Sequence, residues 1–477
     1  PITIYVNYST GNDSTGDGTS GTPYKTFHKA YTMSSGGDTL DLTGTFDWSN
    51  ADETGDVTTS GYVIDKDLIL QGQSASTTFI QAASSAETAG KKVFSVSGSY
   101  DLTIQDLNIR YGYPTTYTSG GCINVGGTAT LTMNRSEVNN CKAYRGYGGG
   151  IYASGDTTIT NSSIYSNGVY YDGAGIVITS GADLIMTNST VYNNIGPGYP
   201  SYNGGGILVG ANDNTTATAT ITNCTITGNY TPYGGGGIYV SGNAGLVLNL
   251  KNTIVAGNTS NNGGQYNNVF KETAATITSN GYNIVGASKY YTAATGDWTD
   301  QDNNGTYDLY SIGTTGSLNL DSSSANNDNT YGTLTYGIQS SSIAINNANA
   351  TANNGVSIPS TDQRGAGRNS TADIGAFEYD GDYTITQPTT QASSISFSSV
   401  NFTQIDLSWT AGNGSKNIVF VKQANTGTAS PVDESNYTAN AAFGSGSQIS
   451  STGWYAVYDG TGTSVTLTGL SAGTDYI

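Results

Sequence analysis

Four basic side chains stand out, because basic residues are scarce in this sequence and these four fall in successive repeats. They are Arg110, Arg135, Lys142 and Arg145, and the acidic residues Glu137 and Asp172 lie in the same stretch. A polysaccharide lyase needs a Lys or Arg base beside a cation that neutralises a uronate carboxylate. The set therefore allows a catalytic cleft, although ion pairs on a solvent-exposed face are the interpretation that we favour.

A glycoside hydrolase needs two or three carboxylates that converge on one face. Between residues 149 and 258 acidic residues are sparse and fall at different phases of the repeat: Asp156, Asp172, Asp183 and Asp213. We therefore predict a chain without a catalytic site of its own, in preference to a lyase or a hydrolase.

One loop has the composition of a calcium site. The pattern D-x-D-x-N-G-x-x-D offers oxygen ligands at alternate positions around a glycine. Its members are Asp300, Asp302, Asn304, the carbonyl of Thr306 and Asp308. Ser311 replaces the usual bidentate Glu, so the loop predicts modest affinity for Ca²⁺, and a plain polar loop is the alternative.

Tyrosines offer a second kind of binding chemistry. Each lies four or five residues before a recurring Ile: Tyr147, Tyr171, Tyr202 and Tyr233. Stacked repeats would align these rings in a column, and flat rings with hydroxyl edges suit sugar rings. We predict a glycan- or surface-binding face, and packing over Gly-rich corners is the alternative.

The composition excludes several partners. The 477 residues include 16 Lys and Arg against 35 Asp and Glu, a formal net charge of -19. Phosphate binding needs clustered basic residues, so we expect no nucleic acid partner. Without an apolar run of roughly 18 residues, we expect no direct membrane insertion. The 65 Gly, with abundant Asn, Thr and Ser, predict an all-β fold with tight corners.

A repeat of about 29 residues sets the architecture. A Gly-rich corner precedes an Ile at intervals of 25 to 31 residues: Ile123, Ile151, Ile176, Ile207 and Ile238. In the same units Asn flanks an aliphatic residue on both sides, as in NSSIYSN from Asn161 and NCTITGN from Asn223. Stacked coils would place the Ile side chains in an internal column and the Asn side chains in hydrogen-bonded ladders.

The stretch NRSEVNN from Asn134 departs from this pattern, because Glu137 stands where the aliphatic residue belongs. Either the register slips by one residue there or the coil is modified. The N-x-S/T triplets at Asn134, Asn161, Asn188 and Asn223 follow from the ladder pattern, which we favour over glycosylation.

Three cysteines, an odd number, exclude a closed disulfide framework. A bridge between Cys122 and Cys141 is one alternative. We favour the other, in which Cys122, Cys141 and Cys224 are small buried residues of the coils.

The repeat resembles right-handed parallel β-helix proteins of the pectate-lyase-like superfamily, whose enzymes usually act on polysaccharides. The opening, ITIYVNYSTGNDSTGDGTSGTPYKTFHKAYTMSSGGDTLDLTGTF, is similar to the entry segment of bacterial members. The resemblance implies a cap over residues 1–48, with a short helix over PYKTFHKAYTM, and coils over 49–280. A cap is also required physically, because an uncovered first coil would expose its core and its strand edges.

Residues 281–380, with TDQRGAGR and ADIGAFEYDG, resemble the choice-of-anchor Q module of secreted bacterial β-helix proteins. The residues that match its closing motif are Asp362, Arg364, Arg368, Asp373, Gly375 and Glu378. From their charges we expect Asp362 and Asp373 to pair with Arg364 and Arg368 and to close the last coil, a structural role.

After a linker at 381–394, residues 395–477 resemble a fibronectin type III-like domain. Trp409 takes the place of its core tryptophan, and Leu470 and Tyr476 resemble its tyrosine corner. The last strands of such a sandwich are missing, so we expect the natural chain to continue. The insertion at about 425–453 resembles surface proteins exported by type IX secretion, which implies secretion or surface-anchoring machinery as a partner.

The predicted fold is thus all-β, a right-handed parallel β-helix solenoid followed by an incomplete fibronectin type III-like β-sandwich. We predict a non-catalytic, adhesin-type rod, extracellular or on a bacterial cell surface, that displays a glycan- or surface-binding face. A polysaccharide lyase or glycoside hydrolase is the first alternative, and a structural spacer in a giant adhesin is the second.

Overall fold

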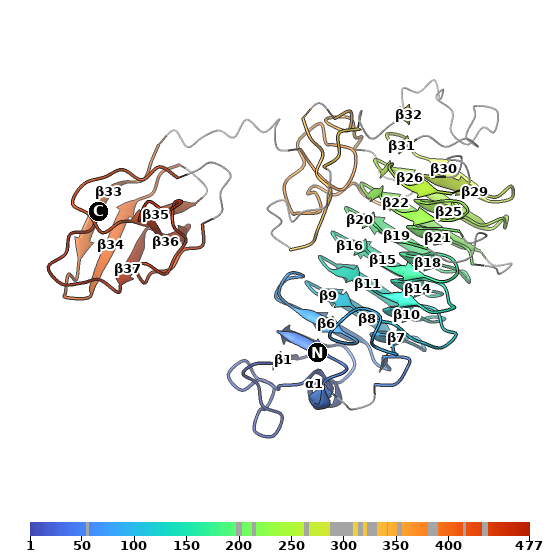
Figure 1. The fold of residues 1–477 in the computed structure, drawn as a ribbon, viewed down its shortest axis with the longest axis horizontal. Helices are drawn as coiled ribbons and strands as arrows, with labels where there is room; N and C mark the ends of the chain where they lie inside the picture. The colour runs from blue at the N-terminus through green and yellow to red at the C-terminus, as the bar shows by residue number, and fades with distance from the viewer. Residues whose placement is uncertain are drawn as a thin grey trace. The chain divides into compact units, whose positions relative to one another are not determined.

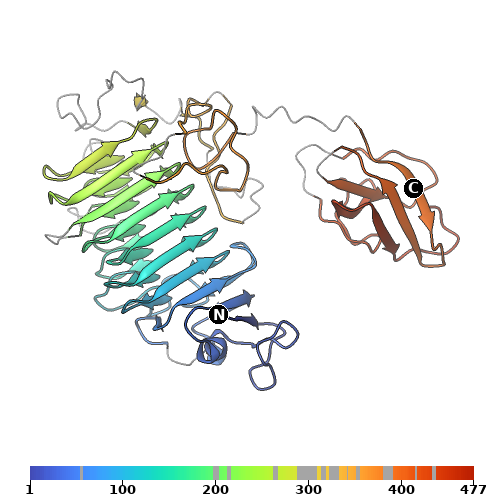
Figure 2. The same cartoon turned by 180° about the vertical axis from the view of Figure 1, so that it is seen from behind.

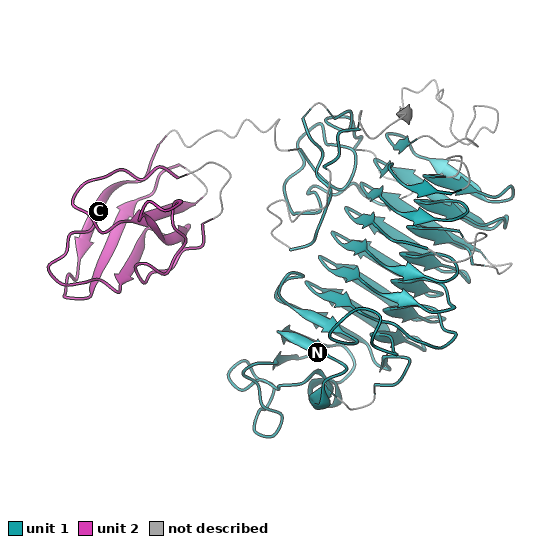
Figure 3. Cartoon of the chain, viewed as in Figure 1, with its two compact units in different colours: residues 1–380 teal, residues 381–477 magenta. Residues whose placement is uncertain are grey.

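The computed structural model describes residues 1–53, 57–196, 203–211, 216–261, 267–286, 309–312 (backbone only), 318–321, 332–340, 342–350, 355–379, 390–413, 416–431 and 437–477. The chain divides into two compact units, residues 1–380 and 381–477 (Figure 3). Strands dominate the described parts of both units, so the predicted all-β class is confirmed. Among the described residues, no helix combines the length and the apolar character that a membrane crossing requires.

Unit 1 is a solenoid of three parallel sheets, and from β2 to β31 the chain visits them in a fixed order (Figure 1). Sheet 1 contains β1 (Thr3–Asn7), β2 (Asp38–Thr43), β5 (Leu68–Gln71), β8 (Asp101–Gln105), β11 (Thr130–Asn134), β15 (Thr157–Thr160), β19 (Asp183–Thr187), β22 (Ala217–Thr222), β26 (Leu246–Lys251) and β30 (Thr276–Ser279). Sheet 2 contains β3 (Thr45–Asp47), β6 (Phe79–Gln81), β9 (Asn108–Arg110), β12 (Glu137–Asn139), β16 (Ser163–Tyr165), β20 (Thr190–Tyr192), β23 (Thr225–Thr227), β27 (Ile254–Val255), β31 (Ile284–Gly286) and β32 (Leu309–Ile312). Sheet 3 contains β4 (Tyr62–Ile64), β7 (Phe94–Val96), β10 (Ile123–Val125), β14 (Ile151–Ala153), β18 (Ile176–Ile178), β21 (Ile207–Val209), β25 (Ile238–Val240) and β29 (Val269–Lys271).

The predicted Ile column is confirmed in sheet 3. Neighbouring strands pair Ile123 with Ile151, and the register continues through Ile176 and Ile207 to Ile238. All five side chains are buried. Because alternate residues of each strand point into the solenoid, one apolar core runs through the coils.

The predicted helix at the N-terminal end is also confirmed, as α1 (Phe27–Met33). The hydroxyl of Thr26 accepts the N–H of Lys29, and the carboxylate of Glu53, in the short 3₁₀ turn Ala51–Glu53, accepts the N–H of Phe27. Phe27 is fully buried, with its ring centroid 5.2 Å from that of Trp48. The helix therefore covers the core at this end of the solenoid.

Two files of asparagine run along the solenoid, as the repeat predicted. In the inner file each Nδ2 donates to the Oδ1 of the next coil at 2.9–3.0 Å, through Asn167, Asn194, Asn229 and Asn258. Each Oδ1 also accepts the main-chain N–H of the preceding member. The members of the outer file have φ angles of 45–51°, which Asn tolerates better than most residues: Asn161, Asn188, Asn223 and Asn252.

The coil at Asn134 slips by one residue, which is the first of the two predicted alternatives. Strand β12 pairs with β16 so that Val138 lies beside Ile164, and Val138 is the buried aliphatic residue. Arg135, with a φ of 49°, consequently takes the outer-file position. Cys141 takes the inner-file position, where its N–H donates to Asn167.

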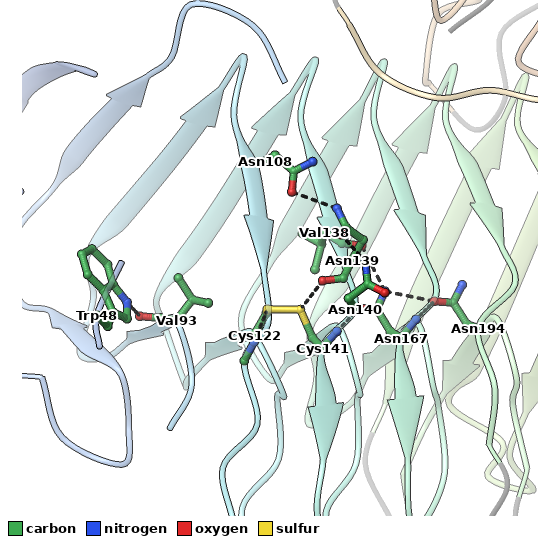
Figure 4. The surroundings of a disulfide bond; sticks show 11 residues. Trp48, Val93, Asn108, Cys122, Val138, Asn139, Asn140, Cys141, Asn167 and Asn194 are labelled. Carbon is green, nitrogen blue, oxygen red and sulfur yellow. Dashed lines mark hydrogen bonds between the residues drawn. A yellow bond between two sulfur atoms is a disulfide. The ribbon is translucent and has the colours of Figure 1, made fainter. Parts of the chain in front are cut away.

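Cys122 and Cys141 form a disulfide at the end of the inner file (Figure 4), with their Cα atoms 5.4 Å apart. Our preference for unpaired cysteines at these two positions is therefore wrong. The slipped register places Cys141 next to the Gly-rich corner that carries Cys122, and their separation of 19 residues gave no sign of this. Cys224 is unpaired and buried, as predicted.

The described residues of 332–379, which we name the C-terminal strap, lie along the outer face of sheet 2 (Figures 1 and 2). The N–H of Leu334 donates to Glu137 Oε1 at 2.7 Å, and Gln363 Nε2 donates to Ser163 Oγ at 2.7 Å. The strap thus folds back beside earlier coils. We expected the charged motif of this segment to close the last coil. That prediction is wrong, because the segment lies beside earlier coils.

The charged motif of the strap is buried and has a structural role. Arg364 pairs with Asp362 at 2.8 Å, as predicted, but Arg368 pairs with Glu378 at 3.0 Å. The carboxylate of Asp373 accepts the main-chain N–H groups of Asn346 and Tyr379 instead of pairing with an arginine. Arg368 also donates to an amide of the outer Asn file, so the network fixes the strap to the side of the solenoid.

Unit 2 contains two antiparallel sheets that fit a β-sandwich. One sheet contains β33 (Ser393–Ser398), β34 (Gln404–Thr410) and β37 (Ser464–Thr468), and the other contains β35 (Asn417–Val421) and β36 (Tyr455–Gly460). Trp409 is buried in its core with Leu407, Val457 and Leu467. The hydroxyl of Tyr476 accepts the N–H of Ser471 at 3.0 Å.

The inner Asn file predicts a large effect of one buried amide. In Asn194→Ala the N–H of Asn167 loses its acceptor and Asn229 Oδ1 loses one of its two donors, all at buried positions, so the free energy of unfolding should fall by about 2–4 kcal/mol. Chemical denaturation measures this change. Asn193→Gly is the control, because Asn193 is exposed with a φ of 51° that glycine adopts readily, and should cost less than about 1 kcal/mol. Equal losses in both variants would contradict the ladder.

The disulfide predicts how many thiols react. The native chain should show none, because Cys224 is buried and burial raises the pKa of its thiol to about 12. After denaturation without reductant one thiol per chain should react, and after reduction all three cysteines should. Titration with a thiol reagent counts them. Three reactive thiols before reduction would contradict the bridge.

Candidate functional site

The structure divides the four predicted basic residues among three places. Arg110 ends β9, lies 4.0 Å over the ring of Phe79 and donates to Gln81 at 2.8 Å. Arg135 makes two hydrogen bonds of 2.7 Å to the carboxylate of Asp106. Both guanidinium groups are therefore engaged with neighbouring side chains, Arg110 on sheet 2 and Arg135 at the turn between sheets 1 and 2, as expected for a structural role.

Lys142 and Arg145 lie at the corner that leads from sheet 2 to sheet 3. Lys142 belongs to β13 (Lys142–Ala143) and pairs with Glu87 at 3.0 Å. Arg145 is exposed, and its guanidinium carbon lies 5.6 Å from the ring centroid of Tyr117 and 5.5 Å from that of Tyr144. Arg145 is thus the most exposed cation of the set, and it lies beside two tyrosine rings.

Glu137 is buried, and its carboxyl group has a raised pKa. Its Oε2 accepts from Asn108 at 2.7 Å and from the hydroxyl of Tyr165 at 2.9 Å, and its Oε1 accepts from Leu334. Burial raises its pKa to about 7, against the opposing effects of Leu334, Tyr165 and Arg110. Such a carboxyl suits proton transfer, but the C-terminal strap lies on it.

Asp172 does not join Glu137. It lies before β18, and its carboxylate accepts the N–H of Asn203 in the following coil. Burial raises its pKa to about 6. The predicted catalytic set is therefore dispersed over separate parts of the solenoid.

Six tyrosines form one group of touching rings at the corner with Arg145, which we name the tyrosine cluster: Tyr113, Tyr117, Tyr144, Tyr147, Tyr170 and Tyr171. Their ring centroids are 5.4–6.5 Å apart from neighbour to neighbour. The hydroxyls of Tyr117 and Tyr171 lie 3.0 Å apart. None of the six is buried, and Tyr117 is 68% exposed, so the cluster presents rings and hydroxyls to solvent.

The register of the coils produces this cluster. Strand β13 pairs with β17 (Gly168–Val169), and Lys142 lies beside Gly168. Tyr144 and Tyr170 each follow two residues later, so their rings meet across the coils at 6.1 Å. Arg145 has a φ of 52°, an uncommon conformation for an arginine.

The predicted tyrosine column is present in part. Tyr147 and Tyr171 lie 5.8 Å apart within the cluster. Tyr202 lies outside the described residues, and Tyr233, 42% exposed, lies before β25. Sequence reasoning missed the other four members. Lys142-x-Tyr144 and Gly168-x-Tyr170, separated by one repeat, were the available signal for two of them.

The predicted calcium loop, Asp300 to Asp308, lies outside the described residues. Within the ranges that the structure does describe, no three His, Cys, Asp or Glu side chains are grouped so as to hold a metal ion.

Comparison with known proteins bears on the solenoid. Residues 92–280 match a family model described as a right-handed β-helix region, which confirms the predicted right-handed parallel β-helix. No curated protein matches the chain. Among solved structures, a rhamnogalacturonan lyase is similar over 58% of this chain and 86% of its own, at 14% identity and a TM-score of 0.35. The pectate lyase Pel9A is similar over 79% of this chain and 96% of its own, at 15% identity and a TM-score of 0.39.

The raised pKa of Glu137 predicts a dependence of stability on pH. Its pKa is about 7 in the folded chain and near 4.5 when unperturbed, so between these values the folded state holds a proton that the unfolded chain has released. The free energy of unfolding should therefore fall as pH rises through this window, by about 3 kcal/mol from this group. Glu53, Asp172 and Asp373 also have raised pKa values and act in the same direction.

Denaturation at about pH 5 and about pH 8 tests this linkage. Glu137→Gln cannot titrate at this position. Between the two pH values its free energy of unfolding should therefore fall less than that of the parent, and the difference should be most of the predicted ~3 kcal/mol. Asp183→Asn removes an exposed carboxyl and should leave the difference unchanged. An unaltered difference in Glu137→Gln would show that Glu137 is already charged across this range.

Proposed function

We propose that this chain is a non-catalytic carbohydrate-binding rod, in which the β-helix presents the tyrosine cluster to a glycan. The observation that carries the proposal is the group of six touching, solvent-accessible tyrosine rings around Arg145. Ring faces pack against the C–H faces of sugars, while tyrosine hydroxyls and the guanidinium N–H groups bond to sugar hydroxyls. A rigid solenoid holds these groups in place before binding, which lowers the entropic cost of association.

The location that we propose is outside the cell, on a bacterial surface. The Cys122–Cys141 disulfide supports it, because disulfides persist in oxidising compartments and are rare in the cytosol. A solenoid with few basic residues and a net charge of -19 is also suited to remaining soluble there.

Finer assignments follow from the sequence resemblances. We propose that unit 2 is a fibronectin type III-like domain, which the buried Trp409 and the bond between Tyr476 and Ser471 support. We propose likewise that residues 281–380 are a choice-of-anchor Q module. Type IX export, a surface-anchoring partner and a Ca²⁺ ion at Asp300–Asp308 are proposals that rest on the sequence alone.

A polysaccharide lyase or hydrolase is the second candidate. Glu137 favours it, as a buried carboxyl of raised pKa near Arg110. The strap residue Leu334 occupies one oxygen of that carboxyl, however, and Arg110 is engaged by Gln81 and Phe79. Release of unsaturated sugars from a panel of acidic polysaccharides, lost in Glu137→Gln, would favour the enzyme over the rod.

Binding to a glycan array tests the proposed function. Tyr171→Ala and Tyr144→Ala each remove a ring at the centre of the tyrosine cluster, and each should weaken binding to the preferred glycan by about tenfold or more, or about 1.4 kcal/mol. Tyr100→Ala is the matched control, because Tyr100 is 38% exposed and lies outside the cluster. Its binding should equal that of the parent. No glycan bound by the parent, or equal signals in all variants, would leave the spacer hypothesis.

A further inference from the structure

We infer that the tyrosine cluster is one half of an elongated site that takes an internal stretch of a linear, neutral polysaccharide along the axis of the solenoid. This inference rests on the proposed function and names the class of glycan. The other half is a groove beside the cluster that nothing above has assigned.

The groove has a volume of about 470 Å³ and lies at the corner that carries the disulfide. Its lining includes the loop residues Ala86 and Glu87, then Lys142, and the exposed side chain of Ile195. Three further lining residues come from successive coils and have φ angles of 51–52°, which turn the chain at the same point of each coil: Asn140, Ser166 and Asn193. The groove thus offers an apolar wall and a row of polar side chains.

The groove and the tyrosine cluster are parts of one surface. Lys142 lines the groove, and its Nζ lies 5.8 Å from the ring centroid of Tyr113. Lys142 and Tyr144 both point outward on either side of the buried Ala143, because alternate residues of an extended segment share a face. Gly168 repeats this arrangement with Tyr170 in the next coil. The groove therefore borders the cluster along two coils.

The length of the combined surface indicates the form of the ligand. Tyr113 and Asn193 lie three coils apart, and β13 and β17 belong to the two coils between them. At the spacing between strands, this separation is about 14 Å along the axis. A single terminal sugar would contact one or two of these coils. A linear chain parallel to the axis contacts all of them, and each coil presents equivalent groups to the next sugar.

The charges favour a neutral chain. Lys142 is paired with Glu87 at 3.0 Å, so its charge is compensated within the site. The chain as a whole carries a net charge of -19, which repels polyanions over the screening distance. Asn, Ser and Tyr side chains, which both donate and accept hydrogen bonds, suit sugar hydroxyls.

The test is a series of linear β-1,4-linked glucose, mannose and xylose oligomers, each from the monosaccharide to the hexasaccharide, with calorimetry on the full chain. In at least one series we expect affinity to rise with length and to level off once the chain spans the site. Equal affinity for a monosaccharide and its hexasaccharide, or no binding in any series, would overturn the inference. A glycan-array signal that depends on Tyr171 would still support the proposed function in that case.

A variant that fills the groove separates its contribution from that of the tyrosines. Ala86→Trp places a large side chain in the groove, so hexasaccharide affinity should fall about tenfold, to the level of the disaccharide. Disaccharide affinity should not change. Ser84→Trp, on the same exposed loop but outside the lining, is the control and should bind like the parent. An unchanged hexasaccharide affinity in Ala86→Trp would show that the groove is not part of the site.

Discussion

The register between successive coils is the constraint on which the rest of this structure depends. In a parallel solenoid each strand pairs with the equivalent strand of the next coil, so a residue type that suits one position suits the whole file. The inner Asn file illustrates the consequence. Each buried amide satisfies the backbone of one coil and the amide of the next, so loss of register in one coil would leave polar groups unsatisfied in its neighbours.

One slip in that register explains several residues that have the appearance of chemistry. Because the coil at Asn134 is displaced by one residue, an arginine enters the outer Asn file and bonds to Asp106. The same displacement puts Glu137 at the outward position of sheet 2 that Ser163 occupies in the next coil. It also ends the inner file with Cys141 in place of an asparagine. A basic residue, a buried carboxyl and a disulfide therefore share one structural cause, and none of them requires a catalytic function.

The sequence predicted what its period determines. The Ile column and the Asn files follow from residues that recur in step, whereas the capping helix and the buried Trp409 were expected from the family resemblances. The disulfide and the strap were not predicted correctly, since each depends on where distant segments meet. Nothing in the spacing of Gln363 and Ser163, 200 positions apart, indicates that they bond. The tyrosine cluster was predictable in part. Tyr144 and Tyr170 occupy equivalent positions of successive repeats, whereas other members, such as Tyr117, lie in loops whose contacts the repeat does not determine.

The outer faces of sheets 2 and 3 are covered, in contrast to the corner at β13 and β17. On sheet 2 the strap lies over the outward side chains of Ser163, Thr190 and Thr225, all of which are buried. On sheet 3 the outward residues Val177 and Leu208 are buried as well, because Gly-rich corners fold over them. Gly173 has a φ of 72°, and a Cβ there would lie 2.1 Å from Val177 Cγ2, so only glycine allows this approach. The corner that carries Lys142 and Gly168 retains exposed rings and a groove over several coils, so the binding that we propose would require no rearrangement of the solenoid.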